Sequence, residues 1–426
     1  MGFATNYMAK HGPGKRYIEN LPEKDLKCIA VIPAYNESGL IQSLDSLLQC
    51  KPTVSSVEII TVFNWPFGSD HHTINENLKI REEASLWAKE HNTPGKKFHF
   101  ITAPGMDKKN SGVGFARKTG MDEAICRFND LDQPAGIILS LDADVKVEKN
   151  YFLEIEKFFN NNMKASGCNI YFEHPLTGNF PDEIYKGVIQ YELHMRYYIQ
   201  SLRYAGHPNA FHTIGSAFAV RAKDYCLQGG MNKRQAGEDF YFLQKFFDLG
   251  NFSECKSTTV YPSPRPSMRV PFGTGMIISD FMTHKQELGS YHPELFEILR
   301  SFLEHSPGLY DHAGSGDYSF LNKIHRSMQN FLVINHFQDK MREIWINSSS
   351  RESFHKRFFR WFNMFRVLKF LNFGKNEFPA VPVLKAAGTL LLKMNRAANI
   401  PGQPEELLYL YREIEKMESF NRPLPQ

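Results

Sequence analysis

The sequence predicts an α/β protein, with a mostly parallel sheet flanked by helices, followed by an α-helical C-terminal region. From Cys28 to about Tyr261, short apolar runs alternate with stretches of helical periodicity, which is the pattern of β–α–β units and a largely parallel sheet. Beyond Asp280 the strand-like runs fade and helical periodicity continues to the end of the chain. A proline-rich stretch between Tyr261 and Pro271 separates the two patterns and predicts an ordered loop.

Each predicted strand is an apolar run that ends in a polar or turn-forming segment. The first covers residues 28–32 and is stopped by Pro33, and three more are expected at 57–63, 98–101 and 136–141. Helical spacing of apolar residues predicts helices at 38–49, 75–90, 114–128 and 185–204, and another that begins at Glu238. We therefore expect an N-terminal extension (1–24), an α/β domain (25–280) and a helical C-terminal region (281–426).

The composition excludes several classes of protein. The 426 residues include 50 Lys and Arg against 46 Asp and Glu, a formal net charge of +4, so charge does not indicate a nucleic-acid-binding protein. Hydrophobic residues make up 42% of the chain, which is typical of a globular rather than a disordered protein. Because the sequence has no apolar leader, no run of about 18 apolar residues and no paired cysteines, we expect a cytoplasmic protein with reduced thiols.

Ligands of open α/β sheets bind at the carboxyl ends of the strands, so the residues after each predicted strand are candidates for a site. Pro33-Ala-Tyr-Asn-Glu37 follows the first strand. By itself this segment is typical of a turn and a helix cap. The ring of Tyr35 also suits stacking on a base, and Asn36 and Glu37 offer short polar groups.

Asp142 and Asp144 follow the fourth predicted strand. Two carboxylates two residues apart at a strand end can hold one hard divalent cation, Mg²⁺ or Mn²⁺, that bridges to phosphate oxygens. The same spacing at Asp130 and Asp132 lies in a polar loop before the strand, and we interpret that pair as solvated surface. Position after a buried strand distinguishes the two pairs.

Glu238 and Asp239 begin a predicted helix with an apolar face formed by Phe242, Leu243, Phe246 and Phe247. Acidic residues in a first helical turn complement the helix dipole. A carboxylate that takes a proton from a hydroxyl group also needs a rigid, partly desolvated position of this kind. Taken alone, the segment leaves both interpretations open.

Four segments together resemble glycosyltransferase family 2, the inverting enzymes of the GT-A fold, and within it the bacterial, non-processive type. They are Val31-Ile-Pro-Ala-Tyr-Asn-Glu37, residues 112–120 with Ala116-Arg117, Leu141-Asp-Ala-Asp-Val145 and Gly237-Glu-Asp239. Their order and spacing fit that family over roughly residues 25–260. The resemblance implies a GT-A-like sheet and transfer of a sugar from a UDP- or GDP-sugar to a hydroxyl group of a glycan or lipid-linked acceptor.

The resemblance also implies a role for each matched residue. Asp239 would be the catalytic base, positioned by Glu238. Asp142 and Asp144 would hold the diphosphate through Mg²⁺ or Mn²⁺, with Asp144 as the direct ligand. The residues implied for the nucleotide site are Pro33, Tyr35, Asn36, Glu37 and Arg117, with Asn64 after the second strand.

The chain departs from the family pattern at two places. The family has an Asp-rich segment after its second strand, where a carboxylate reads the base, and here Asn64 takes that position. The Gln-x-x-Arg-Trp motif of processive members is also missing, because Arg360-Trp361 lacks the glutamine. We therefore leave the base open and do not expect a processive polysaccharide synthase.

Two further features lie outside the matched segments. Arg265 and Arg269, in a Pro/Gly-rich loop after the α/β core, suit a lid over the diphosphate or pairing with acidic residues of the helical region. Between Phe354 and Leu371, aromatic residues share one helical face and cations the other. Such a helix commonly packs on a core. It could instead lie on an anionic membrane, at the inner face near a lipid-linked acceptor.

Other functions remain open at this stage. A sugar nucleotidyltransferase shares the α/β setting and the metal, but it needs a Gly-rich, Arg-containing loop directly after the first strand, and residues 33–37 are not one. A catalytically silent nucleotide-sugar-binding or scaffold protein would not need the carboxylates Asp142, Asp144 and Asp239. A dinucleotide-binding oxidoreductase is less compatible, because Arg117 stands where its third glycine belongs.

Overall fold

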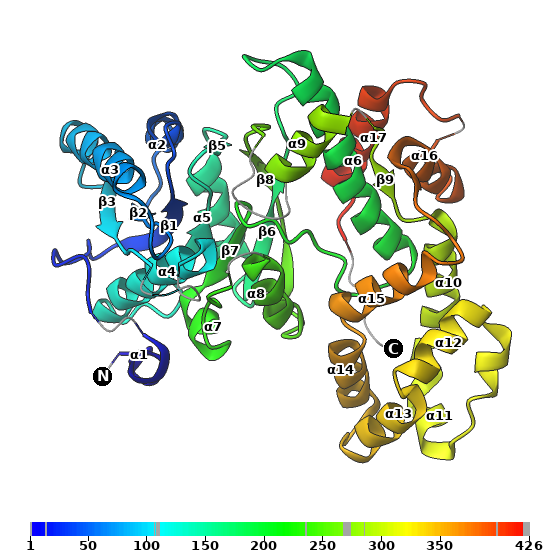
Figure 1. Ribbon diagram of the computed structural model, residues 1–426. Helices are drawn as coiled ribbons and strands as arrows, with labels where there is room; N and C mark the ends of the chain where they lie inside the picture. The colour runs from blue at the N-terminus through cyan, green and yellow to red at the C-terminus, as the bar shows by residue number, and fades with distance from the viewer. Residues whose placement is uncertain are drawn as a thin grey trace. The chain divides into compact units, whose positions relative to one another are not determined.

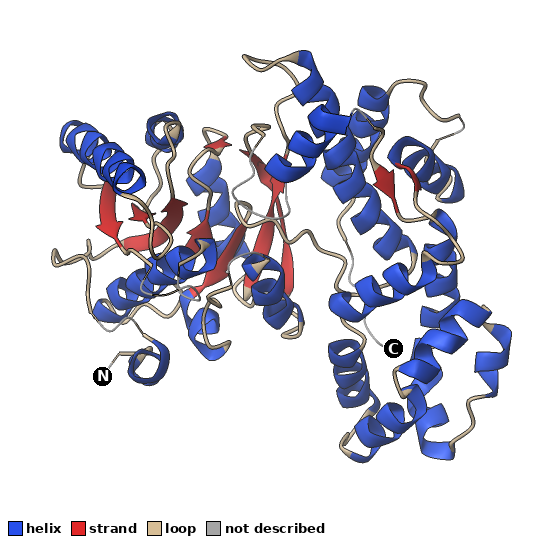
Figure 2. Cartoon of the chain, viewed as in Figure 1, coloured by secondary structure: helices blue, strands red, loops and turns tan. Residues whose placement is uncertain are grey.

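The computed structural model describes residues 2–12, 15–105, 107, 111–234, 237–266, 274–284, 286–397 and 399–420. The chain forms two compact units (Figure 1). Unit 1 consists of Met1–Gly178 and Thr213–Met276, and unit 2 of Asn179–His212 and Ile277–Gln426. Unit 1 holds the main sheet, and unit 2 is built almost entirely of helices (Figure 2). The predicted class, α/β with a helical C-terminal region, is confirmed.

The sheet of unit 1 has the strand order β3-β2-β1-β4-β7-β6-β8-β5. The pairs β3–β2, β2–β1, β1–β4 and β6–β8 are parallel, and the pairs β4–β7, β7–β6 and β8–β5 are antiparallel. The four predicted strands are β1 (Leu26–Ala34), β2 (Ser56–Phe63), β3 (Lys96–Thr102) and β4 (Ile137–Ser140). The others are β5 (Lys146–Val147), β6 (Gly167–Phe172), β7 (Phe218–Arg221) and β8 (Phe252–Tyr261).

Helices cover both faces of the parallel half of this sheet. Helices α2 (Leu40–Leu48) and α3 (His71–His91) lie on one side of it and α4 (Val113–Asp130) on the other (Figure 1). Helix α4 approaches β1 and β2 closely at Gly120, which has no side chain. A Cβ atom there would come within 2.5 Å of Val31 and 2.8 Å of Val62. Further along α4, Arg127 forms a buried ion pair with Glu58 of β2. The helix is therefore fixed directly on β1 and β2.

The remaining helices of unit 1 are α1 (Thr5–His11), α5 (Tyr151–Asn161), α7 (Ala222–Leu227) and α8 (Glu238–Phe247). Helix α1 contacts α4, where the hydroxyl group of Tyr7 donates to Asp122 at 2.7 Å. Helix α8 begins at the predicted residue, after Gly237 in the left-handed conformation (φ 68°). The predicted apolar face of α8 is buried, as expected for Phe242, Leu243, Phe246 and Phe247.

One prediction about β1 is wrong, because Pro33 does not stop the strand. β1 continues to Ala34, with Pro33 in register with Val62 of β2. The pairing of β1 with β4 ends earlier, at Val31 and Ser140. Beyond that point β1 no longer pairs with β4, so a proline without an N–H group is tolerated there, as it is at the edge of a sheet.

Unit 2 contains α6 (Asp182–Tyr204), the helix predicted at 185–204, which packs against α10, α16 and α17. The other helices are α9 (Thr274–His284), α10 (Pro293–Leu303), α11 (Leu309–Ser315), α12 (Arg326–Ile334), α13 (Phe337–Ile346), α14 (Arg351–Trp361), α15 (Met364–Gly374), α16 (Val383–Lys393) and α17 (Pro404–Met417). Two short strands, β9 (Gly289–Ser290) and β10 (Val381–Pro382), pair beside them. In the described part of the chain, no helix has both the length and the apolar character needed to cross a membrane.

The single amphipathic helix predicted between Phe354 and Leu371 is wrong in extent, because two helices, α14 and α15, cover this segment. The side chain of Asn363 caps α15 by accepting a hydrogen bond from the N–H group of Arg366 at 3.1 Å. Within this segment, the buried aromatic side chains are Phe354, Phe358, Phe362 and Phe370. These side chains pack in a core, as the commoner of the two expectations has it, whereas Phe365 is exposed.

Candidate functional site

The predicted site residues of unit 1 lie at the carboxyl ends of neighbouring strands and near the N-termini of two helices. The strand-end residues are Glu37 after β1, Asn64 after β2, and Asp142 and Asp144 after β4. The helical residues are Arg117 in α4 and Glu238 and Asp239 in α8. Because β2, β1 and β4 are adjacent and parallel, their carboxyl ends meet at one edge of the sheet.

The side chain of Arg117 organises this cluster. It is 2% exposed, and its guanidinium group donates to Glu238 Oε1 at 3.2 Å, to Asp142 Oδ1 at 2.8 Å and to the carbonyl oxygen of Gly215 at 2.9 Å. Ser140 Oγ accepts from the same guanidinium group and donates to the same carbonyl oxygen at 2.6 Å. One buried arginine thus joins the end of β4, the start of α8 and the segment before β7.

Asp239 lies next to this arginine. A Cβ atom on Gly215 would lie 3.0 Å from both Asp239 Oδ2 and Arg117 Nη2, so a glycine at this position leaves room for both groups. The other oxygen, Oδ1, accepts from the N–H group of Phe240 at 2.7 Å. Partial burial, together with the charge of Glu238, raises the pKa of Asp239 to about 7. This carboxylate can therefore exchange a proton near neutral pH.

Asp144 belongs to a second group of charged side chains, which is centred on Arg265. Arg265 Nη2 lies 2.5 Å from Glu37 Oε2 and 3.3 Å from Asp144 Oδ2. Glu37 is buried, but the side chain of Asp144 is 30% exposed and that of Asp142 is 42% exposed. Partial burial and the nearby charges of Glu37 and Asp142 raise the pKa of Asp144 to about 6. The three carboxylates are close enough to affect one another, and those of Asp142 and Asp144 are open enough for a ligand to reach them.

The turn after β1 is held from α3. The N–H group of Asn36 donates to Asn77 Oδ1 at 2.9 Å, and Asn77 Nδ2 donates to Asn36 Oδ1 at 2.5 Å. Asn36 has a φ of 47°, a left-handed conformation that asparagine tolerates. This reciprocal pair fixes the segment from Pro33 to Glu37, in which Tyr35 is partly exposed.

Asn64 connects the end of β2 to the start of α4. It is 4% exposed, and its Nδ2 atom lies 3.5 Å from the carbonyl oxygen of Ser111 and 3.3 Å from that of Gly112, to which it donates. Its own N–H group donates to the carbonyl oxygen of Ala34 at 3.1 Å. Gly112 caps the helix that carries Arg117, so Asn64 supports that helix. Its part in reading a base stays a prediction.

Arg269, which was also predicted for the site, lies outside the described residues. The pair Asp130 and Asp132, which has the spacing of Asp142 and Asp144, does not join this cluster. Of the comparison pair, Asp130 forms an ion pair with Arg16, and Asp132 Oδ1 accepts from the N–H group of Phe3 at 3.1 Å. Position after a buried strand, rather than the spacing itself, therefore separates Asp142 and Asp144 from a pair with the same pattern.

Three supporting residues were not predicted from the sequence: Ser140, Gly215 and Asn77. Ser140 is a polar residue in an apolar strand two positions before Asp142, a signal that could have identified it. Gly215 begins the segment before β7, where a glycine is a general sign that another group approaches the backbone. Asn77 gives no local signal, because the partner that it holds is 41 residues away in the chain.

The carboxylates fit a divalent cation that phosphate oxygens help to coordinate. Mg²⁺ is usually held by one or two carboxylates together with substrate phosphates, and Asp142 and Asp144 supply such oxygens. Arg265 already brings positive charge between Glu37 and Asp144, so their oxygens converge on one point. Within the described ranges, no group of three or more His, Cys, Asp and Glu side chains is placed to hold a metal ion.

The sequence matches no family model and no curated protein. Among solved structures, the chain is similar to S. aureus TarS 1–349 in complex with UDP-GlcNAc, with a TM-score of 0.41 and 14% identity over 76% of this chain and 92% of that chain. The TM-scores are 0.38 for TarS 1–349 alone and 0.37 for its complex with UDP, each with 13% identity over 79% of this chain and 92% of that chain. Likeness at this level assigns no function, which has to be argued from the residues of the chain itself.

Proposed function

We propose that unit 1 is an inverting glycosyltransferase that moves a sugar from a nucleotide-diphosphate sugar to a hydroxyl group of an acceptor. The observation that carries the proposal is that Asp239 and Asp142 both lie against one buried arginine, Arg117, at the carboxyl edge of the sheet. A proton acceptor and a carboxylate pair suited to a metal–diphosphate are thus parts of one cluster. The resemblance of four sequence segments to glycosyltransferase family 2 supports the same assignment.

In the proposed reaction, Asp239 takes the proton of the acceptor hydroxyl group. The acceptor oxygen attacks the anomeric carbon from the face opposite the nucleoside diphosphate, which leaves with the electron pair of its bond to the sugar, so the anomeric configuration is inverted. A pKa raised to about 7 makes Asp239 a stronger base than an ordinary aspartate, yet leaves much of it ionised at neutral pH. Glu238, bonded to Arg117 at 3.2 Å, positions the first turn of α8.

Asp144, with Asp142, would hold Mg²⁺ or Mn²⁺ in this proposal. The bound ion would supply positive charge to the diphosphate as it leaves. The bond from Arg117 to Asp142, at 2.8 Å, orients that carboxylate. The exposure of both side chains, 42% and 30%, leaves them accessible to a ligand.

The donor in this proposal is a UDP- or GDP-sugar. The residues that we propose for its binding are Pro33, Tyr35, Asn36, Glu37, Asn64, Arg117, Asp142, Arg265 and Arg269. The hydrogen bonds between Asn36 and Asn77 support a preformed turn for the nucleotide, in which the ring of Tyr35 would stack on the base.

For the acceptor we propose a glycan or a lipid-linked sugar. We propose further that the protein is cytoplasmic and reaches this acceptor by binding peripherally to the inner face of the membrane. The aromatic core of the segment from Phe354 to Leu371 is not free for this contact, because it is buried in unit 2. Its exposed members would have to carry the contact, and these are Lys356, Arg357, Arg360, Phe365 and Lys369. Such a contact would be mainly electrostatic.

The test is to screen the full chain with UDP- and GDP-sugars in the presence of Mn²⁺, and to follow release of the nucleoside diphosphate with and without candidate acceptors. We expect turnover of one donor class, its loss on addition of EDTA, and a product of inverted anomeric configuration by NMR. Retention of configuration would contradict the role of Asp239. Failure of every donor to bind or react would contradict the proposal as a whole.

A further inference from the structure

We propose that Arg265 is an internal cation that bridges Glu37 and Asp144 and competes with the divalent metal ion for Asp144. The inference rests on the proposed function, because it concerns the metal–diphosphate site, and it adds a regulatory property to that site. Until a nucleoside diphosphate and its metal ion enter together, a guanidinium group of the protein itself holds the carboxylates.

The contacts of Arg265 are those of a cation at a shared point. A single atom, Nη2, lies 2.5 Å from Glu37 Oε2 and 3.3 Å from Asp144 Oδ2. The side chain of Glu37 is 5% exposed, so water screens its charge poorly and a counter-charge is needed beside it. In an enzyme that binds a metal–diphosphate, a divalent ion held by Asp144 would supply a similar counter-charge beside Glu37.

The fit of Arg265 is incomplete, which favours displacement. A guanidinium group binds a carboxylate best as a fork of two parallel hydrogen bonds, but here one nitrogen is shared between two carboxylates. Among the described residues, its buried Nε atom has no hydrogen-bond partner, which makes this arrangement less stable than a fully paired one. Pro264 and Pro266 flank the residue and restrict its backbone, so the side chain, which is 27% exposed, is the part that can swing away.

Competition of this kind would couple the metal to the donor. A metal ion alone has to break both contacts of Arg265 and then lies beside a displaced positive charge, which repels it. A diphosphate removes that penalty, because its oxygens complete the coordination of the metal and accept hydrogen bonds from the displaced guanidinium group. The metal is therefore expected to bind weakly by itself and tightly with the nucleotide.

The test measures Mn²⁺ binding to the full-length protein without nucleotide, from the electron paramagnetic resonance signal of the free ion. We compare the wild type with Arg265→Gln and with Arg265→Met, which keeps the length of the apolar stem. We expect both variants to bind Mn²⁺ about tenfold more tightly than the wild type, or better, because a competing and repelling positive charge is gone. Equal affinity of wild type and variants, including no binding by any of them, would overturn the proposal.

Two control variants test whether the gain in Mn²⁺ affinity is specific to Arg265 and Asp144. Arg16→Gln removes a different guanidinium group of unit 1, which pairs with Asp130, and should leave the affinity unchanged. Adding Asp144→Asn to Arg265→Gln should abolish the gain. A gain in Arg16→Gln, or one that survives Asp144→Asn, would refute competition at Asp144. Since the readout needs no substrate, a protein that turned over no nucleotide sugar would still give a clear result for Arg265.

Discussion

Units 1 and 2 each contain a cluster of arginine and carboxylate side chains, and the two clusters differ in how their charges are matched. In unit 1, among the residues that the structure describes, Arg117 and Arg265 stand among five carboxylates: Glu37, Asp142, Asp144, Glu238 and Asp239. The cluster is also open, since the side chain of Asp142 is 42% exposed and that of Asp144 30%. Among the described residues, the cluster thus holds more carboxylates than cations, and a ligand can reach Asp142 and Asp144.

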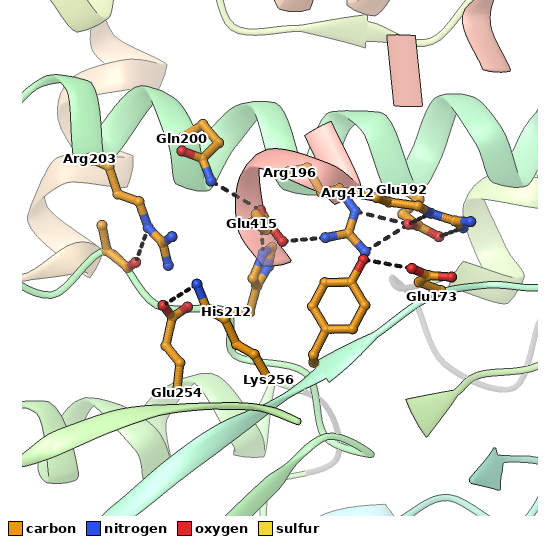
Figure 3. Close-up of polar contacts among 12 residues, drawn as sticks. Glu173, Glu192, Arg196, Gln200, Arg203, His212, Glu254, Lys256, Arg412 and Glu415 are labelled. Atoms are coloured by element: carbon orange, nitrogen blue, oxygen red, sulfur yellow. Dashed lines mark hydrogen bonds and ion pairs between the residues drawn. The ribbon is translucent and has the colours of Figure 1, made fainter. Parts of the chain in front are cut away.

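In unit 2 the charges are matched and closed to solvent, with the side chains pointing toward one another (Figure 3). Arg412 donates two hydrogen bonds to Glu192, at 2.7 and 2.8 Å. Arg196 pairs with both Glu192 and Glu415, and His212 Nε2 lies 3.1 Å from Glu415 Oε1. Burial alone would raise the pKa of Glu415, but Arg196 and His212 outweigh burial and hold that pKa well below its usual range.

The direction of the pKa shifts separates the two clusters. Glu415 is held as a charged partner, so its network ties α6 to α17 within unit 2. Asp144 and Asp239 have raised pKa values. Their charged forms are therefore only partly stabilised by the protein, and a proton or a bound cation would stabilise each of them further. Partly buried carboxylates that are left unmatched are typical of functional sites.

The largest effect is expected from Asp239→Asn. The amide keeps the size of the side chain but cannot accept the proton, so turnover should fall by about 10²–10⁴-fold while donor binding is retained. Steady-state rates and a donor titration check this. Asp25→Asn, an exposed aspartate of the same unit, is the matched control and should behave as wild type. Near-normal turnover in Asp239→Asn would remove this residue from the mechanism.

The next largest effect is on the stability of the matched cluster. Arg196→Met leaves Glu415 buried with less than its full counter-charge, which should cost about 3–5 kcal/mol of unfolding free energy. Arg351→Met removes an exposed arginine that forms two 2.7 Å bonds to Asp311, and should cost little stability because water screens this pair. Chemical denaturation compares the two variants. Similar losses in both would mean that burial and matching do not distinguish the network.

A smaller effect concerns the pH dependence of the unmatched cluster. Burial, and next to it Glu238, raises the pKa of Asp239 to about 7, so kcat/KM should rise with pH through about 7 as the base ionises. Glu238→Gln removes the neighbouring negative charge and should move this rise to lower pH. Glu156→Gln, at a glutamate bonded to Ser55 instead, should leave it in place. If kcat/KM of Glu238→Gln rose over the same pH range as that of the wild type, Glu238 would not contribute to the raised pKa of Asp239.

The same shift has a stability consequence of defined sign. Because the pKa of Asp239 is higher in the folded protein than in the unfolded chain, its contribution to stability is present at low pH and is lost as pH rises through about 7. Asp239→Asn should therefore flatten the fall in melting temperature between about pH 4 and pH 7. An unchanged slope would contradict the raised pKa.

The smallest expected effect is that of Ser140→Ala. The hydroxyl group donates to Gly215 at 2.6 Å and accepts from Arg117, so its loss should cost about 1 kcal/mol of stability and loosen the arginine. Thermal unfolding measures the first effect and kcat the second. Ser166→Ala, at a buried serine whose hydroxyl group has no partner in the described structure, is the control and should not lower stability.

Local sequence patterns predicted the strands and helices that carry the site. The features that they failed to predict depend on contacts between residues far apart in the sequence. The strands and helices around Asp142 and Asp239 follow from apolar periodicity and were found close to their observed bounds. Pro33 was misassigned because its tolerance depends on where β4 stops pairing. The helix break at Asn363 is a capping signal inside an aromatic run. The contact of Arg265 with Glu37 spans 228 residues, and no local pattern encodes it.

The central claim is that the unmatched carboxylates of unit 1 bind a nucleoside diphosphate through a divalent cation. The most direct measurement is calorimetric titration of UDP and GDP into the wild type and Asp144→Asn, with Mn²⁺ and with EDTA. We expect the wild type to bind one of the nucleotides in Mn²⁺, and binding to be lost in EDTA and weakened at least tenfold in Asp144→Asn. Absence of nucleotide binding by the wild type in Mn²⁺, or equal binding by Asp144→Asn, would contradict it.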